Sequence, residues 1–160
     1  MGEPYTPDMA AFVERFAADM TEAGMQRMAA RVFACLLVSQ EETLSSAELA
    51  ERLQISPAAI SGAVRYLAQV HLVSRERQPG SRRERYRLHH DLWYEAMANR
   101  DTILSRWTTT MRSGVEVVGD GSPAGRRMSE AAEFLEFLQR EMNDILDRWR
   151  ARHHGDRPPA

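Results

Sequence analysis

Two short helices separated by three residues, with a strand pair directly after them, constrain the fold of this chain more than any other feature. The segment SSAELAERL has Ser45 and Glu48 at capping-box spacing, which marks the start of a brief helix. In the following segment, SPAAISGAVRYLAQVHL, Ser56 can cap a second helix and Pro57 occupies its first turn, where a missing N–H costs nothing. This arrangement is typical of a helix-turn-helix.

The second of these helices has two unlike faces. Ile60, Val64 and Leu67 recur at i, i+4 and i+7, so they are expected to point inward. A helix must approach base edges closely to read them, so an outer face without bulky apolar side chains suits the major groove of DNA. That outer face carries Ala58, Ser61, Gly62, Arg65 and Gln69.

A β-hairpin is predicted directly after this helix. LVSRER and ERYRL have strand character, and Pro79 and Gly80 favour a turn between them. Tyr86 and Leu88 are expected to face the core. Six of the thirteen residues in RERQPGSRRERYR are arginine, and a narrow hairpin can carry such cations beside a duplex backbone or into a minor groove. The alternative is a solvated surface hairpin.

The charge of the chain is divided unevenly. The net charge is −2, yet residues 44–88 hold eight arginines against four glutamates, and the remaining residues hold 13 arginines against 19 acidic residues. The chain contains no lysine. The absence of lysine is a property of the whole composition, whereas the clustering of arginine in the middle favours an anionic partner for that segment.

Helices are predicted on both sides of this basic segment. An amphipathic helix covers residues 8–22, and a helix over about 25–40 is apolar nearly all round, which is typical of a buried central helix. A long helix runs from about 90 to 111. The stretch SGVEVVGDGSPAG that follows it contains four glycines and a proline and is interpreted as a loop.

The last predicted helix, over about 126–152, carries a heptad seam whose seven apolar positions are separated alternately by three and four residues. Such a seam packs against another helix, either the first helix of the same chain or a second copy of the chain. A homodimer is favoured, because two-fold pairing doubles the contacts on a palindromic site. The predicted dimerisation residues are Met128, Ala131, Leu135, Leu138, Met142, Ile145 and Trp149.

No catalytic or metal-binding pattern stands out. The histidines other than His71 form adjacent pairs, whereas metal ligands on a helix usually stand at i and i+4. The sequence offers no nucleophile with a base at a meaningful spacing, no phosphate-cradling glycine loop and no paired catalytic carboxylates. We therefore expect no catalytic residues, no metal, no cofactor and no enzymatic activity.

The single cysteine, Cys35, lies within the apolar run VFACLLV. Core packing is favoured over a redox role, because a sensor thiol needs a lowered pKa and access to solvent. The sequence has no apolar run of about 18 residues and no signal-peptide pattern at its start. These features predict a cytoplasmic protein with no membrane partner.

The segment from SPAAIS to ERYRL resembles the winged helix-turn-helix core of the MarR family of bacterial transcription regulators, particularly its GbsR-like branch. The preceding RMAARVFACLLVSQEETLSSAELAERLQIS also fits, so the resemblance covers roughly residues 25–88. It implies a homodimer with interlocking terminal helices, recognition helices in successive major grooves, wings at the neighbouring minor grooves, and release from DNA by a small hydrophobic or aromatic molecule. One departure is His71, where many winged helices have glycine.

The resemblance also implies which residues contact DNA. Ser45 and Ser46 can offer backbone N–H groups to a phosphate. Arg65 is the candidate for base readout, whereas Arg82 and Arg83 supply sequence-independent attraction. The recognition-helix positions are Ser56, Pro57, Ala58, Ser61, Gly62 and Arg65, and the wing positions are Arg77, Ser81, Arg82, Arg83 and Arg85.

A group of aromatic and methionine side chains is expected near the position where the family binds its effector. Each member alone is interpreted as ordinary core, and the group together favours an adaptable apolar pocket for a hydrophobic or aromatic ligand. The predicted effector-binding residues are Phe12, Phe16, Met28, Trp93, Met97 and Trp107.

These observations predict a mainly α protein with a winged helix-turn-helix core and a small β-hairpin wing. The expected parts are an N-terminal dimerisation helix (1–24), the DNA-binding core (25–90), C-terminal dimerisation helices (91–152) and a disordered tail (153–160). The expected function is that of a homodimeric repressor that binds a palindromic operator in double-stranded DNA and is released by an effector. The alternative is a winged-helix protein–protein interaction module without specific DNA binding.

Overall fold

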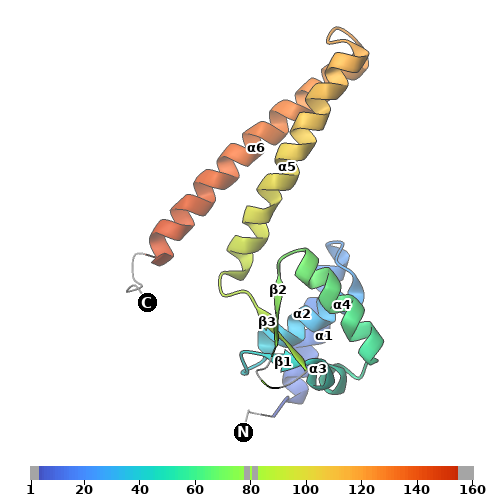
Figure 1. Ribbon diagram of the computed structural model, residues 1–160, viewed down its shortest axis with the longest axis vertical. Coiled ribbons are helices and arrows are strands. Elements are labelled where there is room, and N and C mark those ends of the chain that lie inside the picture. The colour runs from blue at the N-terminus through green and yellow to red at the C-terminus, as the bar shows by residue number, and fades with distance from the viewer. Residues whose placement is uncertain (1–3, 78–79, 81–82, 155–160) are drawn as a thin grey trace. The chain divides into compact units, whose positions relative to one another are not determined.

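The computed structural model of the chain describes residues 4–77, 80 and 83–154 (Figure 1). These residues form helices and a three-stranded antiparallel sheet, and they divide into two compact units with the boundary after Leu92. The mainly α fold with a small sheet agrees with the predicted fold class. Each unit is described separately below.

The first unit contains four helices and the sheet over its described residues, and the second is a pair of long helices. In the first unit lie α1 (Pro7–Glu22), α2 (Arg27–Val38), β1 (Leu44–Ser45), α3 (Ser46–Leu53), α4 (Pro57–Gln69), β2 (Val73–Arg77) and β3 (Glu84–Leu88). The second unit consists of α5 (Leu92–Val118), except for its first residue, and α6 (Pro123–His154).

Local side-chain chemistry sets the start of the helices in the first unit. The Thr6 hydroxyl accepts a hydrogen bond from the backbone N–H of Met9 at 3.2 Å at the start of α1. Ser45 and Glu48 form the predicted capping box on α3, and Ser56 caps α4. Because each cap satisfies backbone donors that the first helical turn leaves unpaired, the short sequence signals were sufficient to locate the starts of α3 and α4.

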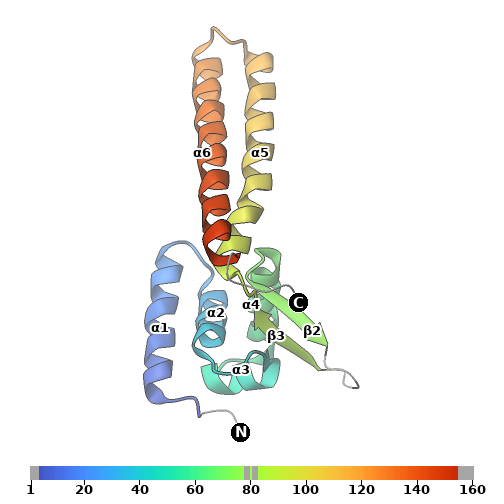
Figure 2. The same ribbon diagram turned by 90° about the vertical axis from the view of Figure 1, so that its left-hand side faces the viewer.

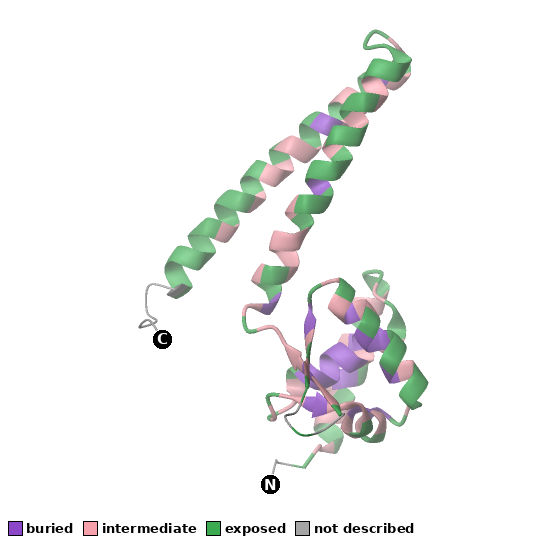
Figure 3. Cartoon of the chain, viewed as in Figure 1, coloured by how far each residue is buried: buried purple, intermediate pink, exposed green. Residues whose placement is uncertain are grey.

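The core of the first unit is built around α2, which contacts α1, α3, α4 and β3. Figure 3 shows α2 as the most continuously buried helix, and Phe33 and Cys35 on it have no exposed surface. Ile60 and Leu67 of α4 are also completely buried, as their spacing predicted. Each such side chain contributes about 1.5–3 kcal/mol through removal from water, so this cluster fixes the orientation of α4.

The sheet has the strand order β1-β3-β2, so β3 is the central strand. In the antiparallel register Arg75 lies opposite Tyr86 and Glu76 lies opposite Arg85. Tyr86 is buried, as predicted, and Leu88 is half-buried. The strand β1 is only two residues long, and it pairs Leu44 with Tyr86.

The loop between the long helices is much shorter than predicted. The sequence suggested that α5 ends near residue 111, but the helix continues to Val118, and only four residues separate it from α6. Gly114 does not break the helix: a Cβ built there would lie 2.6 Å from Sδ of Met128, so glycine at this position allows the two helices to approach. Gly119, with φ +85°, ends α5.

Helices α5 and α6 run antiparallel and side by side (Figures 1 and 2). Residues near the start of α5 contact residues near the end of α6, and residues near the end of α5 contact residues nearer the start of α6. The contacts therefore extend along the pair. The guanidinium of Arg112 lies 3.1 Å from the Glu136 carboxylate, Asn143 donates to Asp101 at 3.1 Å, and Arg150 stacks over the ring of Tyr94 at 4.6 Å.

Only part of the predicted heptad seam on α6 is covered within the chain. Met128, Leu135 and Met142 are half-buried, whereas Ile145 and Trp149 are 54% and 52% exposed. A straight helix drifts about 20° per heptad relative to a strict seven-residue repeat, so the end of the seam turns away from the face covered by its start. Ala131 and Leu138 of the same seam are half-buried.

The helix α6 continues through His153 and His154, two residues into the segment predicted as a disordered tail. Residues 155–160 lie outside the described part of the chain. None of the helices in the described part combines the length and apolarity that crossing a membrane requires.

Candidate nucleic-acid interface

The six positions predicted on the recognition helix all lie on one exposed face of α4 and its N-terminal cap. A Cβ built on Gly62 would meet no atom within 4 Å, so this glycine leaves open space above the helix. The opposite face, with Ile60, Val64 and Leu67, is buried. The exposed members are Ser56, Pro57, Ala58, Ser61, Gly62 and Arg65.

The strand register divides the arginines of the wing, β2 and β3 with their connection, into two sets on opposite faces. Directly paired residues of an antiparallel sheet point to the same face, and alternate residues of one strand share a face. Arg75 and Arg77 therefore share the face of buried Tyr86, and both are exposed. Arg85 and Arg87 point to the other face of the sheet.

Arg85, which the sequence predicted as a DNA contact, has partners within the protein. Its Nε donates to Oγ1 of Thr43 at 2.7 Å, and its Nη2 donates to the Thr43 carbonyl oxygen at 2.7 Å. Nη2 also lies 3.3 Å from Oε2 of Glu48. Its guanidinium therefore joins β3 to the residues around β1, a role that the sequence did not predict, and its contact with DNA stays a prediction.

Two further arginines of the basic segment are also neutralised by nearby carboxylates. Arg87 Nε lies 3.1 Å from Oε1 of Glu76, and Arg52 Nη2 lies 2.8 Å from Oε1 of Glu41. The hydrogen bond from Arg52, with a smaller contribution from that of Ser39, lowers the pKa of Glu41 to about 2. These ion pairs reduce the positive charge that Arg52 and Arg87 present to solvent.

Three exposed arginines of the basic segment have no partner among the residues that the structure describes. Arg65 on α4 and Arg75 and Arg77 on β2 have no hydrogen bond or ion pair to any other residue that the structure describes. Arg75 was absent from the predicted contacts, although its two-residue spacing from Arg77 is the signal that identifies it.

The tip of the wing is only partly described. Arg83 is exposed and interacts with another group of the protein. Ser81 and Arg82, both predicted as wing contacts, lie outside the described residues.

The start of α3, where the sequence predicts a phosphate site, makes several hydrogen bonds within the protein. The backbone N–H and the hydroxyl of Ser45 both donate to Oε2 of Glu48, at 2.6 and 2.7 Å. Although burial acts in the opposite direction, these hydrogen bonds and Arg85 hold the pKa of Glu48 below its ordinary value. The Ser45 N–H thus has a partner in the protein, and the Ser46 hydroxyl lies 3.0 Å from the Tyr86 hydroxyl. Phosphate binding at this helix start stays a prediction.

The predicted effector residues fall on both units. On α1, Phe12 and Phe16 stack with ring centroids 5.7 Å apart, and Phe16 lies 6.3 Å from Phe33 of α2, which the sequence did not single out. Met28 is half-buried on α2. The other three members, Trp93, Met97 and Trp107, lie on α5.

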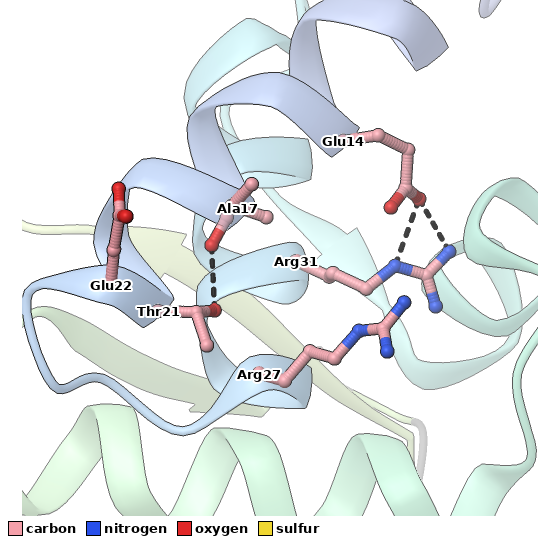
Figure 4. A pocket seen from close by; sticks show the side chains of 7 residues that line it. Glu14, Ala17, Thr21, Glu22, Arg27 and Arg31 are labelled. Atoms are coloured by element: carbon pink, nitrogen blue, oxygen red, sulfur yellow. Dashed lines mark hydrogen bonds and ion pairs between the residues drawn. The ribbon is translucent and has the colours of Figure 1, made fainter.

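A groove of about 390 Å³ lies between α1 and α2, and none of the predicted effector residues lines it (Figure 4). Arg31 crosses this groove and donates to Oε1 of Glu14 at 2.6 and 2.8 Å and to the Leu53 carbonyl at 3.0 Å. Thr21 donates to the carbonyl of Ala17 at 2.7 Å. These contacts tie α1 to α2 and to the end of α3.

Cys35 is completely buried, and burial raises its pKa to about 11. A protonated and inaccessible thiol agrees with the packing role favoured by the sequence. Among the described residues, no three His, Cys, Asp or Glu side chains gather in a way that could hold a metal ion.

The helix α4 leads into β2 through three residues, and Figure 2 shows the hairpin projecting from the edge of the first unit. A short helix with a smooth exposed face, followed by a hairpin with unpaired arginines, defines a winged helix-turn-helix protein of the DNA-binding class.

The comparisons with known proteins agree. Residues 23–84 match the family model described as MarR family, and residues 91–152 match the model of MmpR5-like MarR family transcriptional regulators.

The HTH-type transcriptional regulator MmpR5 of Mycobacterium tuberculosis is 29% identical over 151 residues, which cover 94% of this chain and 92% of that protein. A solved structure described as the crystal structure of a transcriptional regulator is 29% identical, with a TM-score of 0.82 over 89% of this chain and 98% of that one. The chain belongs to the MarR family of transcriptional regulators, and it is a DNA-binding regulator.

The resemblance read from the sequence is therefore confirmed at the level of the family. The matched C-terminal model describes MmpR5-like regulators, and the GbsR-like branch stays a prediction. Members of this family are transcriptional regulators, which are not typically enzymes.

Proposed function

We propose that the protein is a homodimeric repressor that binds a palindromic operator through α4 and the wing and leaves the DNA when a small hydrophobic or aromatic effector binds. The observation that carries this proposal is the set of unpaired arginines, Arg65, Arg75 and Arg77, on and directly after a helix with a smooth exposed face. The exposed residues next to Arg65 on α4, Ala58, Ser61 and Gly62, are small enough for the helix backbone to approach base edges.

The proposed contacts differ in kind. Arg65 reads a base, because an arginine two turns into a recognition helix can reach O6 and N7 of guanine. Arg75 and Arg77 contact phosphates, and Arg82 and Arg83 at the wing tip add sequence-independent attraction. The remaining recognition positions Ser56, Pro57, Ala58, Ser61 and Gly62 form the close-approach surface, and Ser81 completes the wing contacts.

Fluorescence anisotropy on DNA selected from a random library tests this proposal. Each phosphate contact should add about −0.9 to the slope of log affinity against log salt, so Arg77→Ala should reduce the slope by that amount on every sequence. Arg65→Ala should cost about 1–3 kcal/mol, mainly on the selected site. Arg106→Ala, an exposed arginine of the second unit, is the matched control and should leave both quantities unchanged. Binding without salt dependence would favour the alternative, a protein–protein interaction module.

The homodimer is supported by the apolar surface that the second unit exposes. Large apolar side chains are seldom exposed together unless another molecule covers them. Because Met128, Leu135 and Met142 are already half-buried in the chain, the dimerisation surface is expected to centre on the exposed members Ile145 and Trp149. The other large exposed side chains of α6 are Phe134 and Phe137.

Light scattering at micromolar concentration measures the dimer directly. The wild-type protein should have twice the mass of one chain. The Ile145→Asp variant should have the mass of one chain, because the aspartate would be desolvated at the interface. Glu141→Asp, on an exposed polar position of the same helix, is the control and should remain dimeric. A wild-type monomer would refute the proposed two-fold pairing, for which operator half-sites should lie about one helical turn apart.

Effector release is tested with the predicted effector residues, whose aromatic members lie on α1 and on α5. A thermal-shift screen of hydrophobic and aromatic compounds should identify ligands that raise the unfolding temperature, and by thermodynamic reciprocity the same ligands should weaken DNA binding. Phe16→Ala and Trp107→Ala should reduce the shift. Failure of every compound with protein free of co-purified lipid would count against the ligand-responsive part of the proposal.

A further inference from the structure

The wing is connected to the helices of the first unit by very little regular structure. Its central strand β3 pairs with β1, but β1 is two residues long and matches only Leu44 to Tyr86 and Ser45 to Arg85. So short a strand pair has little stability of its own in water. The direction of the wing must therefore depend on side-chain contacts.

Val73 and Tyr86 bury apolar surface of the wing, and Arg85 supplies polar contacts to Thr43 and Glu48. Its guanidinium donates to both oxygens of Thr43, at 2.7 Å each, and Thr43 is the residue directly before β1. Two donors of one planar group bound to one residue fix an orientation as well as a distance, because the guanidinium geometry is rigid. The side chain of Arg85 is 29% exposed, so solvent screens this contact only in part.

The same guanidinium also reaches the start of α3. Nη2 of Arg85 lies 3.3 Å from Oε2 of Glu48, and this oxygen accepts the N–H and hydroxyl of Ser45. One carboxylate thus connects the N-terminus of α3 to β3. The hydroxyls of Tyr86 and Ser46, 3.0 Å apart, add a second link between the same two elements.

We propose that Arg85 is a positioning residue for DNA binding, which holds the wing in the orientation that lets Arg75, Arg77 and α4 contact one duplex together. This inference depends on the proposed DNA-binding function of the wing. Arg85 does not touch the DNA in this role. It acts by removing wing orientations that could not bind, so that less conformational freedom is lost on binding.

The salt dependence of DNA binding separates this role from a direct contact. Arg85→Gln should weaken binding about tenfold, the size expected for loss of one charged hydrogen-bonded link, and should leave the salt slope unchanged. Arg77→Gln should instead reduce the slope by about 0.9. Thr43→Val removes one acceptor of Arg85 without changing any charge, so it should also weaken binding at an unchanged slope. Thr109→Val, on an exposed threonine of α5, is its control.

Hydrogen exchange adds a second measurement that is independent of DNA. Amides of β3 should exchange faster in Arg85→Gln and Thr43→Val than in the wild type, and those of α2 should not. In a double-mutant cycle the two substitutions should be clearly non-additive, because each breaks the same link.

Three outcomes overturn the inference. A fall of about 0.9 in the salt slope of Arg85→Gln would make Arg85 a direct phosphate contact. Faster exchange in β3 with unchanged affinity would show that the wing needs no fixed orientation. Additive effects of the two substitutions would show that they act separately. The proposed function fails in a different way, when Arg65→Ala and Arg77→Gln leave DNA binding unaltered.

Discussion

Gly125, in the first turn of α6, is predicted to be the least replaceable glycine of the helix pair. A Cβ added there would lie 2.1 Å from the carbonyl oxygen of Gly119 and 3.1 Å from that of Asp120, whereas ordinary contacts begin at about 3.4 Å. Both neighbours are backbone atoms and cannot move away by a change of rotamer. Gly125→Ala therefore requires the turn between α5 and α6 to open.

The hydrogen bonds that the opened turn would lose set the size of the effect. Ser122 donates its N–H to the Gly119 carbonyl at 3.1 Å and its hydroxyl to the same oxygen at 2.8 Å, and it accepts from the N–H of Gly125 at 2.9 Å. At about 1 kcal/mol each these bonds amount to about 3 kcal/mol. The better helix propensity of alanine returns about 1 kcal/mol, so the net loss should be about 2 kcal/mol.

Urea unfolding followed by far-UV circular dichroism measures this loss. With a urea dependence of about 2 kcal/mol per molar, the midpoint should fall by about 1 M at equal protomer concentration. Gly121→Ala is the matched control, because a Cβ there meets no atom within 4 Å, and it should change stability by less than about 0.5 kcal/mol. Equal midpoints for the two variants would refute the argument from backbone crowding.

Three further predictions concern the first unit. The Cys35 thiol, whose pKa burial raises to about 11, should react with a thiol reagent at pH 8 only as fast as the protein opens, and a rapid reaction in native protein would contradict its burial. Hydrogen bonds from Arg52 and Ser39 lower the Glu41 pKa from 4.5 to about 2, so their stabilisation is present above pH 4.5 and is lost as the pH falls toward 2. Glu41→Gln should therefore flatten the fall in unfolding free energy across this pH window, and the same dependence of unfolding free energy on pH as in the wild type would contradict it. His71 has φ +59°, where many winged helices have glycine, so His71→Val should cost more than about 1 kcal/mol in urea unfolding while His71→Gly stays within about 0.5 kcal/mol. Equal losses in the two His71 variants would show that the backbone conformation is not the cause.

The elements that the sequence predicted well are those specified by neighbouring residues. Ser45 and Ser56 locate helix starts through contacts three residues away, and Pro57 does so by its place in the first turn. The apolar spacing on α4 separates its buried face from its exposed one. Tyr86 was expected in the core because strand alternation needs no knowledge of the rest of the fold. Local chemistry therefore predicted most of the winged helix and the exposed face of α4.

The features that the sequence did not predict are those that distant residues decide. Gly114 reads as a helix breaker, yet its role depends on Met128 of another helix. Arg85 reads as a wing cation, yet its partner Thr43 is 42 residues earlier in the chain. No periodicity reports such pairings, because they depend on how separate elements pack.

These pairings explain how a chain of net charge −2 can present a basic surface. Glu41 and Glu42, just before the basic segment, pair with Arg52 and Arg87, while Arg65 on α4 and Arg75 and Arg77 on β2 have no partner among the described residues. A count of the six hairpin arginines would predict a salt slope of about −5.4 per protomer. The two hairpin arginines proposed to contact phosphates, Arg75 and Arg77, account for about −1.8, to which contacts at the wing tip would add about −0.9 each. The measured slope therefore reports how many arginines the carboxylates leave available for DNA.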